Sequence, residues 1–230
     1  TAKSRTDLIR ILKMTNLIFP YNSKQALETT MPVLKATVDN IREASKVVKS
    51  GGLVVYPTDT VYGLGCDPFN VRAVEKVFKV KGERKEKPLP ILASDIKFIE
   101  KIAYINEKAR KIAERHWPGP LTLVVPKKPV LPNIVTCGLA SVGVRIPNHT
   151  VALRLISLCD GLLVGTSANK TGEKPPKTAR EATKQLGRQV DIVLDGGPAP
   201  LGQESSFVDL TYRKPKMMRE GPVNLTEVLN

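Results

Sequence analysis

The sequence has few of the residue types that build metal sites and catalytic triads. It contains only two histidines, His116 and His149, and three cysteines, Cys66, Cys137 and Cys159, with no Cys-x-x-Cys spacing. These numbers and spacings argue against a zinc site and against a disulfide framework. Unpaired cysteines are typical of a reducing compartment, so we expect a cytoplasmic protein.

Aromatic residues and long hydrophobic runs are also scarce. Aromatics make up 5% of the chain, which argues against base stacking as its main activity. The early apolar run at 8–14 is interrupted by Arg10 and Lys13, too soon for a membrane span or a signal peptide. We therefore expect no membrane partner.

What the chain has in excess is positive charge. Its net charge is +14 and its isoelectric point is near 9.8, whereas its 41% hydrophobic content is ordinary for a globular domain. Such a charge favours a polyanionic partner, either a nucleic acid or a nucleotide. The alternative is a Lys/Arg-rich surface of the kind found in thermophilic proteins.

Hydrophobic periodicity predicts an α/β fold: a twisted, open, mixed β-sheet with flanking helices. Residues 1–37 are an N-terminal segment of little pattern, with one expected strand at 10–14, and residues 38–230 form the main domain. We expect one helix from Val38 through Val48 that ends at Gly51-Gly52, one through 71–78 with Asn70 as N-cap, one through 151–158 and one near 179–186. Ser94 and Asn106 can cap two further helices, and Pro118-Gly119-Pro120 breaks the second of them. Strands are expected near 53–56, 89–93, 121–125, 142–146, 162–165, 191–194, 207–210 and 216–219.

Polar clusters accompany four of these strands. They are Pro57–Gly63 (PTDTVYG), Ser141–Pro147 (SVGVRIP), Gly165–Asn169 (GTSAN) and Glu204–Asp209 (ESSFVD). Each alone is compatible with a turn or a helix cap. Ligands of open α/β sheets bind where strands end, so four clusters together indicate a binding crevice.

A fifth cluster is basic. The stretch Lys79–Leu89 reads KVKGERKEKPL and lies between an expected helix and an expected strand. It is either a solvated loop or a phosphate clamp, in which the lysines and the arginine of the loop would neutralise phosphate.

In this order, the motifs PTDTVYGLG, KG followed by KPL, WPGPLTLV, SVGVRIP, TSAN and ESSFVDL resemble those of the YrdC family of threonylcarbamoyl-AMP synthases. The resemblance covers residues 38–222 and implies a YrdC-like mixed sheet around a basic concave cavity. It also implies the reaction of L-threonine, bicarbonate and ATP to threonylcarbamoyl-AMP and pyrophosphate. Mg²⁺ would then be carried on the phosphates.

The family's partners follow from the same resemblance. A downstream transfer complex would pass the threonylcarbamoyl group to the adenosine beside the anticodon of tRNA. The family's threonine-binding positions correspond here to Thr60, Arg145, Gly165 and Ser205, with Arg145 pairing the carboxylate at a strand end. Its ATP-binding positions correspond to Lys81, Lys87, Ser141, Ser167, Asn169 and Arg219. No residue is expected to act as a catalytic nucleophile or as a metal ligand.

The sequence departs from the family pattern at three places. Glu83 stands where the family usually has an arginine, and we expect Arg84 to take over its phosphate contact. Pro175 replaces a hydroxyl residue on the ATP side, and Leu92 stands where longer members have a histidine.

Two other functions remain open at this stage. The positive charge alone would suit a non-catalytic double-stranded RNA or tRNA-binding protein. A carbamoyltransferase or maturation domain could use the same sheet, although the zinc modules of such relatives are absent from the sequence.

Overall fold

The computed structural model describes residues 32–82 and 87–229. The expected strand at 10–14 and the positions Glu83 and Arg84 lie outside these ranges. The described residues belong to one compact unit, Met31–Asn230. Within them, no helix combines the length and the apolar character that a membrane span requires.

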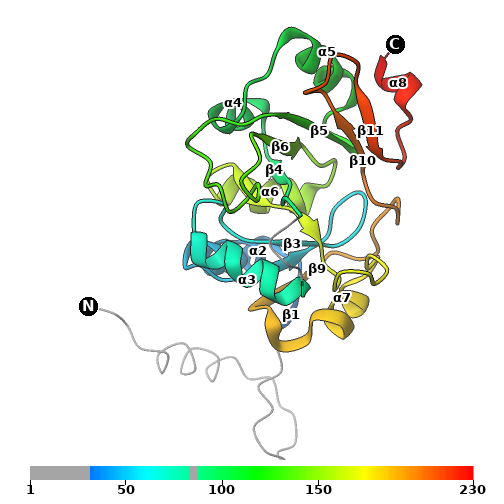
Figure 1. Cartoon of the computed structure of the whole chain (residues 1–230). Helices are drawn as coiled ribbons and strands as arrows, with labels where there is room; N and C mark the ends of the chain where they lie inside the picture. The colour runs from blue at the N-terminus through cyan, green and yellow to red at the C-terminus, as the bar shows by residue number, and fades with distance from the viewer. Residues whose placement is uncertain (1–31, 83–86, 230) are drawn as a thin grey trace, which may run out of the picture. The chain divides into compact units, whose positions relative to one another are not determined.

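The first of two sheets has five strands (Figure 1). Its order is β1 (Val33–Lys35), β9 (Ile192–Asp195), β2 (Val54–Tyr56), β3 (Gly63–Gly65) and β8 (Thr166–Ser167). β9 runs parallel to both β1 and β2, whereas β3 is antiparallel to β2 and to β8. The boundary that we expected at residue 37 stays a prediction, but β1 already pairs with the main unit.

The second sheet has six strands. Its order is β11 (Lys216–Arg219), β10 (Ser206–Asp209), β5 (Leu121–Pro126), β6 (Ser141–Arg145), β4 (Ile91–Ala93) and β7 (Leu162–Val164). Parallel pairs, β10 with β5 and β4 with β6, alternate with antiparallel ones. The mixed α/β class is thus confirmed, with the strands divided between two sheets.

Six longer helices connect the strands, and a short one follows them. They are α2 (Val38–Lys49), α3 (Val71–Lys81), α4 (Ile96–Ile102), α5 (Glu107–His116), α6 (Thr150–Leu158), α7 (Ala179–Leu186) and α8 (Leu225–Leu229), with one 3₁₀ turn at Gly187–Gln189. Asn70 and Asn106 cap α3 and α5 as expected, since their side chains accept from the backbone N–H three residues on. The expected cap Ser94 is wrong: Asp95 caps α4 by accepting from Lys97 N.

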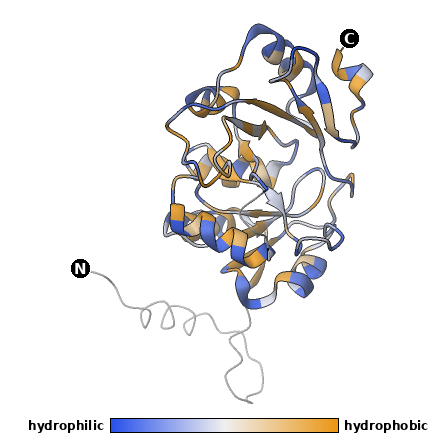
Figure 2. Ribbon diagram, in the orientation of Figure 1, coloured by the Kyte–Doolittle hydropathy of each residue, from blue (hydrophilic) through white to orange (hydrophobic). Residues whose placement is uncertain are grey.

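The hydrophobic residues form two buried clusters. In the smaller one, α2 and α6 pack together with residues of β2 and β9, Leu194 among them. The larger one collects the inner faces of the six-stranded sheet and of α3, α4, α5 and α7. Figure 2 shows β5 and β6 as largely hydrophobic, whereas the peripheral helices mix hydrophobic and hydrophilic residues.

At Gly165 the chain passes directly from one sheet to the other, without a helix between the two strands. β7 of the six-stranded sheet ends at Val164, and β8 of the five-stranded sheet begins at Thr166. A Cβ atom at Gly165 would lie 2.3 Å from Cγ of Leu92, which is less than any real contact allows. Only glycine therefore fits this crossover.

Candidate functional site

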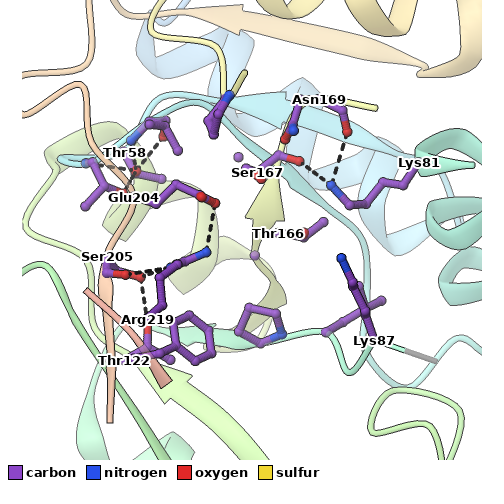
Figure 3. A pocket seen from close by; sticks show the side chains of 18 of the residues that line it. Thr58, Lys81, Lys87, Thr122, Thr166, Ser167, Asn169, Glu204, Ser205 and Arg219 are labelled. Atoms are coloured by element: carbon purple, nitrogen blue, oxygen red, sulfur yellow. Dashed lines mark hydrogen bonds and ion pairs between the residues drawn. The ribbon is translucent and has the colours of Figure 1, made fainter. Parts of the chain in front are cut away.

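Strands and loops from both sheets enclose a cavity of about 350 Å³ (Figure 3), a size typical of small-molecule sites. Nine of the ten site residues expected from the sequence line it: Thr60, Lys81, Lys87, Arg145, Gly165, Ser167, Asn169, Ser205 and Arg219. The expectation that these distant motifs converge is met by their positions, whereas their individual roles stay predictions.

Ser141, the tenth residue, does not line the cavity. It begins β6 and pairs with Pro126, whereas Arg145 ends the same strand at the cavity. The two residues share one face of the strand, but four residues of β-strand separate them by about 13 Å. The structure therefore does not bring Ser141 together with the other nine.

The polar stretch after β2 forms the turn between β2 and β3. The Thr58 hydroxyl organises it: Oγ1 accepts from the backbone N–H of Thr60 at 3.2 Å and of Val61 at 3.3 Å, and it donates to the Val61 carbonyl at 2.6 Å. Its distance to Thr60 Oγ1 is 2.9 Å. This turn ends the buried strand and places Thr58 and Thr60 on the cavity wall.

Arg145 lies at the cavity but is itself buried, with 4% of its surface exposed. Its guanidinium donates to Asp59 Oδ1 at 2.5 Å, Thr60 Oγ1 at 3.0 Å and the Gly119 carbonyl at 2.8 Å. Burial lowers the pKa of Arg145, and the carboxylate of Asp59 opposes that shift. Arg145 thus lies at a strand end on the cavity, as expected, and also has three partners within the protein.

Arg219 has a comparable set of contacts. It donates to Glu204 Oε1 at 2.9 Å, to the Ser205 carbonyl at 3.0 Å and to Ser205 Oγ at 3.1 Å. Its guanidinium carbon lies 4.6 Å from the centre of the Phe207 ring, as in a cation–π contact. Burial lowers the pKa of Arg219, and Glu204 counteracts this.

Lys81 and Lys87 approach the cavity from the side across from Arg219, where Figure 3 shows both ammonium groups. Lys81 is the last residue of α3 and is 4% exposed; its Nζ donates to the carbonyls of Ser167 at 2.9 Å and Asn169 at 3.1 Å. The Asn169 amide in turn donates to the carbonyls of Lys170 and Glu173. These bonds fasten the segment after β8 to the end of α3.

Three residues of the site were not singled out in the sequence: Asp59, Thr122 and Glu204. Asp59 stands inside the quoted turn, and Thr122 is the one polar residue of the apolar strand Leu121–Val125. Glu204 opens its motif, yet its role as the partner of Arg219 depends on the pairing of β10 with β11. The departures Leu92 and Pro175 also line the cavity.

The charges of the described lining favour an anionic ligand. Four cations, Lys81, Lys87, Arg145 and Arg219, face two carboxylates, Glu173 and Glu204. Within residues 32–82 and 87–229, no group of three or more His, Cys, Asp or Glu side chains could hold a metal ion. The donor set thus suits phosphate and carboxylate oxygens, with hydroxyls for a small polar ligand.

Comparisons with known proteins agree with this geometry. Residues 46–221 match the Sua5/YciO/YrdC family model, which is described as "Telomere recombination". Threonylcarbamoyl-AMP synthase of Pyrococcus abyssi is 39% identical over 189 residues, which are 82% of this chain and 56% of that protein. A putative threonylcarbamoyl-AMP synthase of Mycobacterium tuberculosis is 38% identical over 82% of this chain and 87% of its own length.

Among solved structures, P. abyssi Sua5 in complex with L-threonine superimposes with a TM-score of 0.80 at 39% identity. The match covers 82% of this chain and 56% of that one. The chain therefore spans little more than half of the Pyrococcus relative.

Proposed function

This chain belongs to the Sua5/YciO/YrdC family, and on that premise we propose that it is an L-threonylcarbamoyladenylate synthase. In this reaction the amine of L-threonine combines with bicarbonate to a carbamate. The carbamate oxygen then attacks the α-phosphorus of ATP, and pyrophosphate leaves. The convergence of nine family positions on one cavity is the observation that carries the proposal.

The threonine would bind on the wall formed by the β2–β3 turn and the end of β6. There the Arg145 guanidinium would meet the carboxylate, and Thr60 and Ser205 would offer hydroxyls. Gly165 would let the backbone approach the substrate, because no side chain fits at that position. The P. abyssi structure with L-threonine supports this assignment at the level of the family.

The triphosphate would lie between the remaining cations. Lys81, Lys87 and Arg219 would neutralise it, and Ser167 and Asn169 would line the same side. Mg²⁺ would be held chiefly by phosphate oxygens, since the described lining offers two separate carboxylates and no cluster. Its contribution would be to neutralise charge on the transferred phosphoryl group. Ser141 would contact ATP only if the bound nucleotide extended along β6.

The arrangement explains how catalysis can proceed without a protein nucleophile. A carbamate is already nucleophilic, so the transfer depends on alignment of the two substrates and on charge neutralisation at phosphorus. The fixed guanidinium and ammonium groups of the cavity would supply the alignment and the charge neutralisation.

The proposal is tested by pyrophosphate release from ATP with L-threonine and bicarbonate, each omitted in turn. We expect release only when both are present. Equal release without threonine or without bicarbonate would contradict the assignment. A purified protein that releases no pyrophosphate but binds double-stranded RNA or tRNA, with an affinity falling steeply with salt, would favour the RNA-binding alternative.

Beyond the synthase step, we place the protein in the cytoplasm, where its product would pass to a transfer complex acting on tRNA. Cys66 and Cys159 are buried free thiols, as suits a reducing compartment.

A further inference from the structure

Thr122 lies at the floor of the cavity in the middle of the six-stranded sheet. It belongs to β5, pairs with Phe207 of β10 and is 1% exposed. Its Oγ1 lies 2.9 Å from Oγ of Ser205 (Figure 3). Its methyl group faces Gly143, where an added Cβ would lie 3.3 Å from Cγ2. Because the methyl occupies that side, the hydroxyl is directed at Ser205.

The hydrogen-bond partners determine which hydroxyl donates. Arg219 Nη2 lies 3.1 Å from Ser205 Oγ and, being a guanidinium nitrogen, can only donate to it. Within residues 32–82 and 87–229, the Thr122 hydroxyl contacts Ser205 Oγ alone. By distance alone either hydroxyl could donate, but the arrangement in which Thr122 donates to Ser205 gives its buried O–H an acceptor within the protein. Two donors then fill both lone pairs of Ser205 Oγ.

The Ser205 hydroxyl proton can donate in one direction, toward the cavity. Its oxygen accepts from Thr122 and from Arg219, and the residue lines the cavity. The Ser205 O–H therefore donates into the cavity, and the group that it meets there has to be an acceptor.

We propose that Thr122 is a positioning residue that makes Ser205 an obligatory hydrogen-bond donor to the β-hydroxyl oxygen of threonine. The inference rests on the proposed function, in which Arg145 takes the carboxylate. The β-hydroxyl is then the remaining acceptor oxygen of free threonine. Valine, which has a methyl group in that place, would leave the Ser205 donor unpaired in a closed pocket. The Thr122–Ser205 pair thus selects threonine against its isostere.

The test compares the affinities of L-threonine and L-valine by calorimetric titration of the wild type, Thr122→Val and Thr122→Ser. Valine at position 122 keeps the shape and removes the donor, so Ser205 can turn its proton away from the substrate. We expect Thr122→Val to lower threonine affinity about threefold to tenfold, the equivalent of one hydrogen bond, with valine affinity unchanged. Thr122→Ser should restore the wild-type preference.

Ser205→Ala supplies the second measurement, because Thr122 is argued to act only through Ser205. In the Ser205→Ala background, Thr122→Val should have no further effect on threonine affinity. If Thr122→Val does not fold, Thr122→Ala replaces it, since it removes the hydroxyl and adds no atoms.

Three outcomes would overturn the inference. The first is a variant that lacks the Thr122 hydroxyl and still binds threonine with wild-type affinity. The second is a loss of threonine affinity on Thr122→Val that is as large in the Ser205→Ala background as in the wild type, since it would indicate a merely structural role. A wild type that does not bind threonine at all would instead overturn the proposed function, and the inference with it.

Discussion

The guanidinium of Arg145 and the carboxylate of Asp59 form an ion pair of 2.5 Å in which both side chains are buried, 5% and 7% exposed. Arg145 ends β6 of the six-stranded sheet, and Asp59 lies in the β2–β3 turn of the five-stranded one. The residue expected to bind the substrate carboxylate therefore also joins the two sheets. Loss of either partner leaves a buried charge without its counterion.

Asp59→Ala should destabilise the fold. Removal of the carboxylate leaves the Arg145 guanidinium buried without an opposite charge, which costs about 3–5 kcal/mol of unfolding free energy. Urea unfolding measures this loss. Asp39→Ala is the matched control, because Asp39 pairs with Arg42 on the surface at 86% and 57% exposure. It should cost less than about 1 kcal/mol. Equal losses in both variants would contradict the importance of the buried pair.

Arg145→Lys should weaken threonine binding while it keeps the positive charge. The single nitrogen of a lysine cannot donate to Asp59, Thr60 and Gly119 and also bind a carboxylate through two parallel hydrogen bonds, as a planar guanidinium can. We expect a loss of about 1.5–3 kcal/mol in the binding free energy of threonine, measured by calorimetry. ATP affinity serves as the internal control and should hardly change. An unaltered threonine affinity would mean that another group binds the carboxylate.

Arg219→Ala should reduce the affinity for ATP. The guanidinium is held in the cavity by Glu204, Ser205 and Phe207, so its charge is already oriented toward a phosphate. We expect a loss of about 1.5–3 kcal/mol, which titration with ATP and Mg²⁺ would measure. Arg213→Ala, an exposed position before β11, is the control for net charge alone. If both variants lowered ATP affinity equally, Arg219 would act only through the net charge of the protein.

Stability should fall in alkali because of a buried thiol. Burial raises the pKa of Cys159 to about 12, whereas an unfolded cysteine titrates near pH 8.5. A raised folded-state pKa means that the stabilisation is complete below the unfolded value and is lost as the pH rises toward the folded one. Urea unfolding from about pH 8 to about pH 10 should show the decline.

Cys159→Ala is the control for this titration, since it removes the ionising group. The pH dependence of unfolding should be shallower in that variant than in the wild type. The same slope in both proteins would assign the decline to other groups, such as Tyr62, whose pKa burial raises to about 12.

Periodicity predicted most of the elements because their signals are local. α2, α3 and α7 were found from apolar spacing and caps, and α7 begins and ends where it was expected. Three strands of the described residues were missed. β1 (Val33–Lys35) lies in the segment that was read as having little pattern, β3 is Gly63–Leu64–Gly65 without a β-branched residue, and β8 is two residues long. The division into two sheets was also missed, because local patterns do not show which strands pair with one another.

The site was predicted as a set of motifs, and its internal contacts were not. The ordered motifs were sufficient to predict nine residues that line one cavity. The Arg145–Asp59 pair could not be predicted from them, because it depends on how a turn of one sheet meets a strand of the other. Ser141 shows the limit of reasoning by motif. It stands in the same string as Arg145, yet an extended strand carries it to the far end.

Gly165 also sets a dimension of the cavity. Since one residue joins β7 to β8, the distance between the two sheets at that wall is limited by two virtual Cα–Cα bonds of about 3.8 Å each. Among the described residues, Arg219 lies on β11, an edge strand that pairs with β10. The width of the cavity is therefore fixed by covalent bonds at Gly165, whereas at Arg219 it depends on hydrogen bonds and on the contact with Phe207. In the proposed synthase, the covalently fixed width at Gly165 would limit the size of the amino acid that binds beside it.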